Sequence, residues 1–161
     1  PDGVVLSVGG GGLLCGVVEG LRRNGLAHVP VVAVETEGAA SFNRSLHAGQ
    51  QVALERITSV ATSLGAKRVC DRAFYWSKEH DVRSVVVSDL AALEACERFL
   101  ADHRLLVEPA CGASLALAYD TSPALAGLGQ VLFIVCGGVT TTIDQIREWL
   151  VSARRSQHGT Q

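Results

Sequence analysis

Charged residues, aromatic residues and paired cysteines are all scarce in this sequence of 161 residues. Charged side chains make up only 19% and the net charge is −2, so the sequence lacks the basic stripe that would indicate a nucleic-acid partner. Its longest apolar stretch, over residues 3–18, is interrupted by glycines and predicts a strand and a helix rather than a membrane span. The five cysteines are widely spaced without a CxxC pair, which argues against a zinc site or disulfide framework and favours a reducing, cytoplasmic setting.

Methionine is absent altogether, and the first apolar run begins only a few residues after Pro1. Natural amino termini rarely lie so close to a core strand, so we expect this sequence to be part of a longer chain. Hydrophobic residues account for 48% of the sequence, which suits one well-buried α/β domain.

Four consecutive glycines at residues 9–12 are the most informative feature that is present. They lie between an apolar run at residues 4–8 and a helical pattern at residues 13–24. Glycine permits positive φ and removes the side chains that would keep a ligand away from the backbone. The start of the helix adds unpaired N–H groups and the positive end of a dipole. The segment is therefore predicted to bind an anion such as a phosphate; the plainer interpretation, a tight turn or helix cap, needs only one or two glycines.

Strands and helices alternate along the sequence, which predicts an α/β fold with a doubly wound, mostly parallel sheet. The predicted strands cover residues 4–8, 29–35, 85–87 and 131–135, and the predicted helices cover residues 13–24, 68–79, 89–102 (capped by Ser88), a segment starting at 109, and 141–153. The glycines, Glu35 and Cys136 each follow or end a predicted strand. We expect them to meet at the carboxyl edge of the sheet, where such folds bind ligands.

Two familiar phosphate-binding patterns fit poorly. Glu35 lies about 20 residues beyond the glycines, as a ribose-binding acid would in a dinucleotide site. The spacing G-x-G-x-x-G fails, however, because Leu14 and Cys15 occupy the positions that require the last glycine. The P-loop pattern fails because no Gly-Lys-Ser/Thr follows the glycines. A dinucleotide-binding module remains an alternative.

Five motifs in a fixed order indicate a phosphate ligand other than a nucleotide. They are SVGGGGLLCG at 7–16, ETEGA at 35–39, ITSVA at 57–61 with LG at 64–65, VEPACGA at 107–113 and VCGG at 135–138. Together they resemble the carboxyl-terminal half of the eukaryotic-type L-serine dehydratases (serine/threonine ammonia-lyases), which are fold-type II pyridoxal-phosphate enzymes. The resemblance covers residues 3–150. It implies that residues 1–152 are part of a large domain like that of the tryptophan synthase β-subunit, without its upstream half, and that residues 153–161 are a polar tail.

The resemblance also implies how pyridoxal 5'-phosphate is held. The cofactor phosphate would be cradled by Gly9, Gly10, Gly11, Gly12 and the amide of Leu13. Cys136 would face the pyridine nitrogen, and a neutral thiol there suits prompt β-elimination because it leaves the ring a weaker electron sink. The plainer interpretation of Cys136 is a small buried hydrophobe. Glu108 matches an acid near the cofactor pocket, although a helix-start acid favoured by the dipole is an equal alternative.

A monovalent cation site, expected to hold K+, is a further implication. Its oxygen ligands would be the Glu35 side chain, the carbonyls of Ala39, Leu64 and Ala66, and Ser41. Hard oxygen donors are what such an ion prefers. The plainer interpretation of Glu35 is a solvated acid at the end of a strand.

The sequence contains only two lysines, Lys67 and Lys78, both in polar surroundings. Neither matches the Schiff-base lysine of the family, so we expect that lysine upstream and no catalytic residue in this chain. The implied activity of the complete enzyme, a cytoplasmic homodimer, is conversion of L-serine to pyruvate and ammonia, and of L-threonine to 2-oxobutanoate; the chain alone would be inactive. The alternatives are a threonine dehydratase or serine racemase relative, or a non-catalytic cofactor-binding paralogue. The Cys-Gly-Gly ending at 136–138 favours the serine dehydratase branch, whereas residues 139–142 depart from the family pattern.

Overall fold

A four-stranded parallel sheet organises residues 1–158, the part of the chain described by the structure, a computed structural model. The strand order is β3-β2-β1-β4, and every neighbouring pair is parallel. The strands are β1 (Gly3–Ser7), β2 (Val31–Thr36), β3 (Val82–Val87) and β4 (Val131–Phe133). In register, Val5 of β1 faces Val32 of β2 on one side and Phe133 of β4 on the other. The predicted α/β class and parallel sheet are confirmed.

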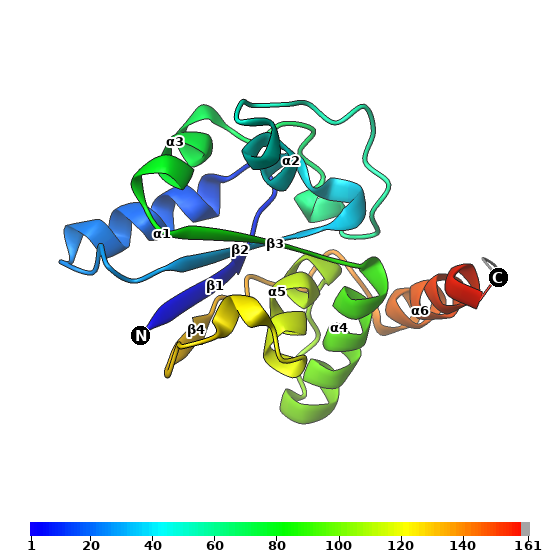
Figure 1. Cartoon of the computed structure of the whole chain (residues 1–161). Helices are drawn as coiled ribbons and strands as arrows, with labels where there is room; N and C mark the ends of the chain where they lie inside the picture. Colours follow the sequence, from blue (N-terminus) through cyan, green and yellow to red (C-terminus); the bar gives the residue numbers. More distant parts are fainter. Residues whose placement is uncertain (159–161) are drawn as a thin grey trace.

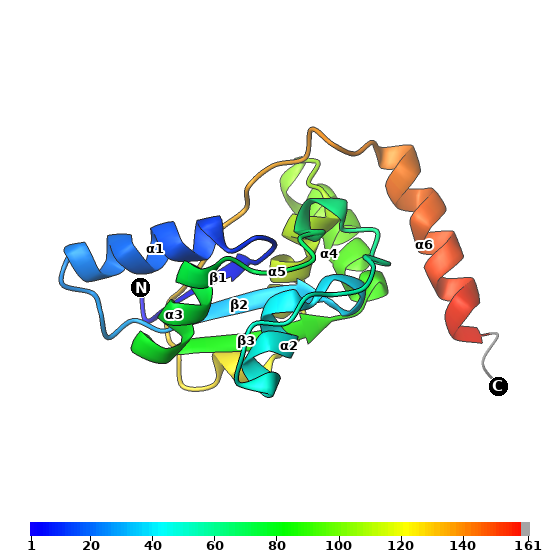
Figure 2. The same cartoon turned by 90° about the horizontal axis from the view of Figure 1, so that it is seen from above.

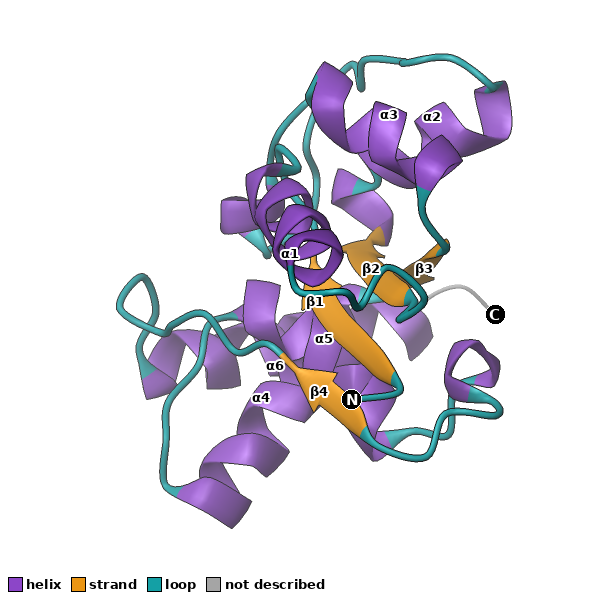
Figure 3. Cartoon of the chain, turned by 90° about the vertical axis from the view of Figure 1, so that its left-hand side faces the viewer, coloured by secondary structure: helices purple, strands orange, loops and turns teal. Residues whose placement is uncertain are grey.

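Helices cover both faces of this sheet. They are α1 (Gly12–Arg23), α2 (Ser41–Ala48), α3 (Asp71–Glu79), α4 (Asp89–His103), α5 (Pro109–Tyr119) and α6 (Ile143–His158), with short 3-10 turns η1 (Glu37–Ala39), η2 (Thr62–Leu64) and η3 (Pro123–Leu125). Figure 1 shows α1, α2 and α3 on one face and α4 and α5 on the other, and Figure 3 shows the same two layers from the side. None of the helices in residues 1–158 is long and apolar enough to cross a membrane.

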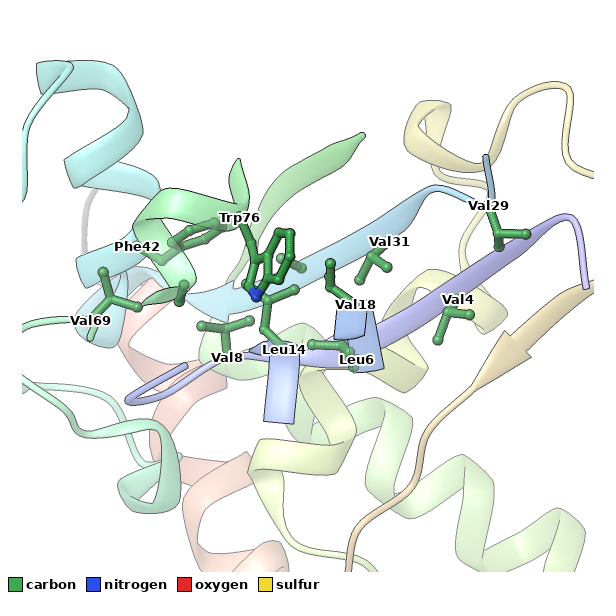
Figure 4. Close-up of a cluster of buried hydrophobic side chains, with 12 residues drawn as sticks. Val4, Leu6, Val8, Leu14, Val18, Val29, Val31, Phe42, Val69 and Trp76 are labelled. Carbon is green, nitrogen blue, oxygen red and sulfur yellow. The ribbon is translucent and has the colours of Figure 1, made fainter. Parts of the chain in front are cut away.

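The two central strands are buried on both faces, which explains their continuous apolar sequences. Successive side chains of a strand point to opposite faces. Val4 and Leu6 therefore pack with Leu14 and Trp76 under α1 and α3, as Figure 4 shows. Val5 packs instead against the α5 side of the sheet. Fully burying a side chain of this kind stabilises the fold by about 1.5–3 kcal/mol.

Several predicted boundaries differ from the structure: β3 begins at Val82 rather than 85, α3 begins at Asp71 rather than 68, and the two elements nearest the C-terminus differ most. The strand predicted at 131–135 ends at Phe133 and is not fully buried, because β4 lies at the sheet edge and pairs with β1 alone among the described strands. Leu132 is consequently 51% exposed. The last helix, which projects to one side of the sheet in Figure 2, runs to His158 instead of ending at 153. Its Arg154 pairs with Glu94 of α4 at 3.1 Å, and the end of the predicted polar tail, residues 159–161, lies outside the described residues.

Two predicted helix starts are confirmed. The Ser88 hydroxyl accepts the N–H of Ala91 at 3.1 Å and caps α4. Pro109 occupies the first turn of α5, where its missing N–H costs nothing. The helix α5 lies between α4 and the sheet, so all its residues from Pro109 to Leu117 are buried. Its start is thereby fixed at the carboxyl edge of the strands.

Candidate functional site

The glycine loop joins the end of β1 to the start of α1. Gly11 is the residue before the helix and has φ +93°, a left-handed conformation that favours glycine. A Cβ at this position would lie 2.5 Å from Cβ of Ala73, so α3 also packs too closely for a side chain. At Gly12 a Cβ would meet no atom within 4 Å, which leaves the outer surface of the loop bare. The loop therefore exposes backbone towards an open space.

That space is a cleft of about 250 Å³ at the carboxyl edge of the sheet. It is lined by Ser7, Gly9, Gly10, Gly11, Gly12, Leu13, Ser63, Leu64, Glu108, Ala110, Cys111 and Cys136. These residues come from the end of β1, the η2 turn, the start of α5 and the segment after β4. The structure thus brings together the predicted phosphate-binding residues, Glu108 and Cys136.

The start of α1 gives this cleft an affinity for anions. Its first turn contains no acidic residue, and no side chain caps it. The start of α5 also lines the cleft but contributes less, because Pro109 has no N–H and the N–H of Cys111 donates to the Glu108 carbonyl at 2.9 Å. N–H groups at a helix start have no acceptor within the helix, and the dipole adds partial positive charge there. The arrangement suits a phosphate group.

Cys111 holds the Cys136 side of the cleft in place. Its sulfur accepts the N–H of Cys136 at 3.2 Å and that of Gly137 at 3.3 Å, and it donates to the Gly137 carbonyl at 3.3 Å. The N–H of Glu108 donates to the same carbonyl at 3.1 Å. The sequence does not reveal this role, because no local pattern distinguishes a packing cysteine from one that binds a segment 25 residues away.

Cys136 is exposed, so the interpretation of it as a small buried hydrophobe is wrong. Partial desolvation raises the pKa of its thiol above the ordinary value, and the neighbouring Cys111 and Glu108 raise it further, which favours the neutral form. Glu108 itself is half-buried and accepts a hydrogen bond from the Thr140 hydroxyl. Its carboxylate makes no capping bond to α5. Of the two alternatives for Glu108, the structure favours a carboxylate that faces the cleft over one that stabilises a helix start.

Glu35 lies at the end of β2 and is completely buried. Its two carboxylate oxygens accept the N–H groups of Phe42 at 2.8 Å and Asn43 at 2.7 Å, so the side chain caps α2. Burial raises its pKa from 4.5 to about 7, against the lowering effect of these two hydrogen bonds. The interpretation of Glu35 as a solvated acid is therefore wrong. The capping role was not foreseen, because the acceptor and the helix start come from separate elements.

The other predicted cation ligands are only partly brought together. Ala39 and Leu64 belong to one buried cluster, whereas both hydrogen bonds described for Glu35 go to α2. The N–H of Ala66 donates to the Leu64 carbonyl at 2.8 Å. The Ser41 hydroxyl is buried and has no hydrogen-bond partner among the described residues. A buried hydroxyl without a partner is costly, and a bound ion or water would satisfy it.

Neither lysine lines the cleft. Lys67 is exposed and donates to the Glu55 carbonyl at 2.8 Å. Lys78 is also exposed, with its ammonium 4.7 Å from the centre of the Phe74 ring. In the part of the chain that the structure describes, the cleft therefore lacks the amine that would bond to a cofactor aldehyde.

Comparison with known proteins gives a consistent result. The chain is 52% identical over 159 residues to the serine dehydratase-like protein of Rattus norvegicus, covering 92% of this chain and 47% of that protein. It is 47% identical over 155 residues to the L-serine dehydratase/L-threonine deaminase of Homo sapiens, covering 91% of this chain and 47% of that protein. The crystal structure of a fungal L-serine ammonia-lyase from Rhizomucor miehei superposes with a TM-score of 0.86 at 38% identity, covering 92% of this chain and 49% of the other.

The chain spans about half the length of the curated relatives that it matches. A family model described as pyridoxal-phosphate dependent enzyme matches residues 1–137, which include the glycine loop and Cys136. This match extends over most of the chain and over every element that lines the cleft. The chain therefore belongs to the pyridoxal-phosphate dependent enzyme family.

Proposed function

We propose that the protein containing this chain eliminates the β-hydroxyl of L-serine and L-threonine, releasing ammonia with pyruvate or 2-oxobutanoate. The observation that carries the proposal is the cleft, which brings the bare glycine loop and the start of α1 together with the thiol of Cys136. The similarity to a serine dehydratase-like protein and to an L-serine dehydratase/L-threonine deaminase supports the same reaction. When bound, pyridoxal phosphate supplies an electron sink for charge that develops at the α-carbon of an amino acid.

The residues present fit this cofactor. The glycine loop lines the cleft with backbone and no side chains, and the uncapped first turn of α1 offers N–H donors for a phosphate. We assign the phosphate to the backbone of the glycine loop and Leu13. We assign the cofactor ring nitrogen to Cys136, which cannot act as a carboxylate would. A neutral partner leaves the ring less electron-withdrawing and favours elimination over transamination.

The decisive assay measures keto-acid release by the complete protein. With L-serine, pyruvate formation is expected and can be followed by coupling to lactate dehydrogenase; with L-threonine, 2-oxobutanoate is expected. If neither keto acid is formed, the proposal is wrong. Accumulation of D-serine without pyruvate would assign the protein to racemisation instead.

The role of Cys136 has a matched pair of variants. Cys136→Ser keeps a neutral hydrogen-bonding group and is expected to retain elimination. Cys136→Asp introduces a carboxylate at the same position and is expected to lower the elimination rate at least tenfold, while cofactor binding persists. Equal rates in the two variants would show that the charge at this position does not matter.

We propose that the lysine bonded to the cofactor belongs to a part of the longer protein outside residues 1–161. The support is that Lys67 and Lys78 both lie away from the cleft. The 161-residue chain is then expected to bind pyridoxal phosphate reversibly but to release no pyruvate from L-serine. Borohydride treatment of the bound mixture, followed by intact-mass measurement, is expected to show no covalent cofactor on either lysine. Serine turnover by this chain would contradict the assignment.

We also propose a K+ site formed by Glu35, Ser41 and the carbonyls of Ala39, Leu64 and Ala66. Its support is the unpartnered buried hydroxyl of Ser41 and a donor set made only of oxygen. K+ is expected to raise the melting temperature relative to choline at equal ionic strength. The Ser41→Ala variant is expected to lose most of that difference, whereas Ser156→Ala, on α6, is expected to keep it. A wild-type chain that melts identically in both salts would contradict the site.

A cytosolic homodimer is the assembly that we propose for the protein. The five free cysteines support a reducing compartment. Leu132 on the edge strand β4, Val139 and Val151 on α6 are exposed apolar side chains that a subunit contact would cover. Light scattering of the complete protein tests the dimer: a mass of one chain at micromolar concentration would contradict it.

A further inference from the structure

Two thiols that the proposed function does not use lie in contact beside the glycine loop. Cys15 is in α1, and Cys70 precedes the first residue of α3. Their sulfur atoms are 3.9 Å apart although 55 residues separate them in sequence. Cys70 is exposed and Cys15 is half-buried, so a reagent in solution reaches Cys70 first. Neither residue lines the cleft.

Both residues are bonded to the backbone of the loop. The N–H of Cys70 donates to the Gly10 carbonyl at 2.9 Å, and the N–H of Cys15 donates to the Gly11 carbonyl at 3.0 Å. A Cβ at Gly11 would lie 2.5 Å from Cβ of Ala73, 2.9 Å from a methyl group of Val69 and 3.3 Å from the sulfur of Cys70. The start of α3 is thus packed directly on the loop, and a displacement of Cys70 towards α1 is transmitted to Gly10 and Gly11.

The two sulfur atoms are 3.9 Å apart, and a bonded pair is about 2.05 Å apart, so they must approach by roughly 1.9 Å. Side-chain rotation, of which the exposed Cys70 is the freer partner, and a shift of the start of α3 are the movements that can close this distance. Burial and the nearby Cys70 and Glu19 raise the pKa of Cys15 to about 11, against the lowering effect of Arg72. The Cys15 thiol is therefore protonated near neutral pH.

We propose that Cys15 and Cys70 form a reversible disulfide that strains the glycine loop when the protein meets a small oxidised disulfide such as oxidised glutathione. The Cys70 thiolate attacks one sulfur of the oxidant, which breaks its S–S bond and releases one glutathione thiol. Cys15 loses its proton, attacks the Cys70 sulfur and releases the second glutathione. The two cysteines lose two electrons and two protons, and the oxidant becomes two thiols. An excess of reduced glutathione reverses both steps.

The bond itself is tested by peptide mapping, which does not depend on the proposed function. The full chain is incubated with oxidised glutathione, free thiols are alkylated, and the protein is digested with trypsin without reduction. A cross-linked peptide joining residues 1–22 to residues 69–72, two hydrogens lighter than the sum, is expected. Recovery of Cys15 and Cys70 as alkylated free thiols would overturn the proposal.

Three variants distinguish the Cys15–Cys70 disulfide from a mixed disulfide with glutathione and from oxidation of another cysteine. Cys70→Ser is expected to abolish the cross-link, and Cys15→Ser is expected to stop at a mixed disulfide between Cys70 and glutathione. Cys136→Ser, which removes another exposed thiol, is expected to leave the cross-link intact. A cross-link that survives Cys70→Ser, or disappears in Cys136→Ser, would contradict the assignment.

The effect on the loop rests on the proposed function, so it is measured separately. Binding of pyridoxal phosphate to the reduced chain is measured first. If the reduced chain does not bind the cofactor, the proposed function is contradicted, whereas the result of the peptide map still stands. The oxidised chain is expected to bind the cofactor at least fivefold more weakly, with recovery after reduction. Unchanged affinity in a fully cross-linked sample would overturn the inference that the bond strains the loop.

Discussion

Replacing Gly112 by alanine gives a sharp test of the packing that fixes the start of α5. A Cβ at Gly112 would lie 2.1 Å from the carbonyl oxygen of Ala92 and 2.6 Å from the sulfur of Cys96, both on α4. Ordinary contact begins near 3.4 Å, so the oxygen is about 1.3 Å too close. Because the obstacle is helix backbone, it cannot rotate away. The two helices must separate, and α5 carries two residues that line the cleft.

The magnitude follows from two opposing effects. Overpacking of a well-filled core costs typically 1–3 kcal/mol, and a backbone clash belongs at about the upper end of that range. Alanine offsets about 1 kcal/mol of this cost through its better helix propensity. The expected net loss is about 2 kcal/mol in the free energy of unfolding. For a domain of this size that loss lowers the melting temperature by roughly 4–8 °C.

Gly16→Ala is the matched control, because a Cβ at this position in α1 meets no atom within 4 Å. The same substitution is expected there to stabilise the chain by about 0.5–1 kcal/mol. Urea unfolding of both variants, followed by far-ultraviolet circular dichroism, gives the two values. If Gly112→Ala is neutral or stabilising while the m-value is unchanged, the close approach of α4 and α5 is refuted.

Three further predictions concern the site. The pKa of Glu35 is higher in the folded chain than its ordinary value, so the stability that this difference contributes is present below pH 4.5 and is lost as the pH rises to about 7. Urea unfolding across this range is expected to show a fall of about 3 kcal/mol in the free energy of unfolding. The Glu35→Gln variant is expected to show no such fall. Cys111→Ala leaves the N–H of Cys136 without its acceptor and is expected to cost about 1–3 kcal/mol in stability, whereas Cys111→Ser is expected to cost less. Gly11→Ala, at φ +93°, is expected to destabilise the chain more than Gly16→Ala stabilises it and to abolish saturable cofactor binding in an absorbance titration.

The elements of the sheet core were predictable because their sequences carry a local signal. A parallel strand buried on both faces is a continuous apolar run, and β1 and β2 have that form. Glycines and Pro109 then marked where helices begin. The exposure of Leu132 was not predictable in the same way, because an apolar run indicates a strand without saying what covers it. The helix α6 extends beyond its predicted end because its polar residues are compatible with a helix. The first glycine, a residue that often ends a helix, comes only at position 159.

The candidate site was predictable only as far as its residues follow strand ends or match ordered motifs. The glycine loop and Cys136 meet in the cleft as the parallel topology requires. The hydrogen bond from the Cys136 N–H to Cys111 and the contact between Cys15 and Cys70 join elements far apart in sequence. The periodicity of apolar residues within one element does not predict such contacts. Such contacts are decided by how helices pack on the sheet, which depends on side chains from the whole chain.

The pairing of the first and last strands has a consequence for folding. Val4 of β1 faces Leu132 of β4, and the N–H of Gln130 donates to the carboxylate of Asp2 across 128 residues. Contacts of such high sequence separation raise the contact order and slow folding. The glycine loop needs residues 1–73, because Cys70 bonds to Gly10 and Ala73 packs on Gly11, whereas the Cys136 wall needs residues up to 137. During synthesis, the phosphate end of the cleft is therefore completed before the opposite wall.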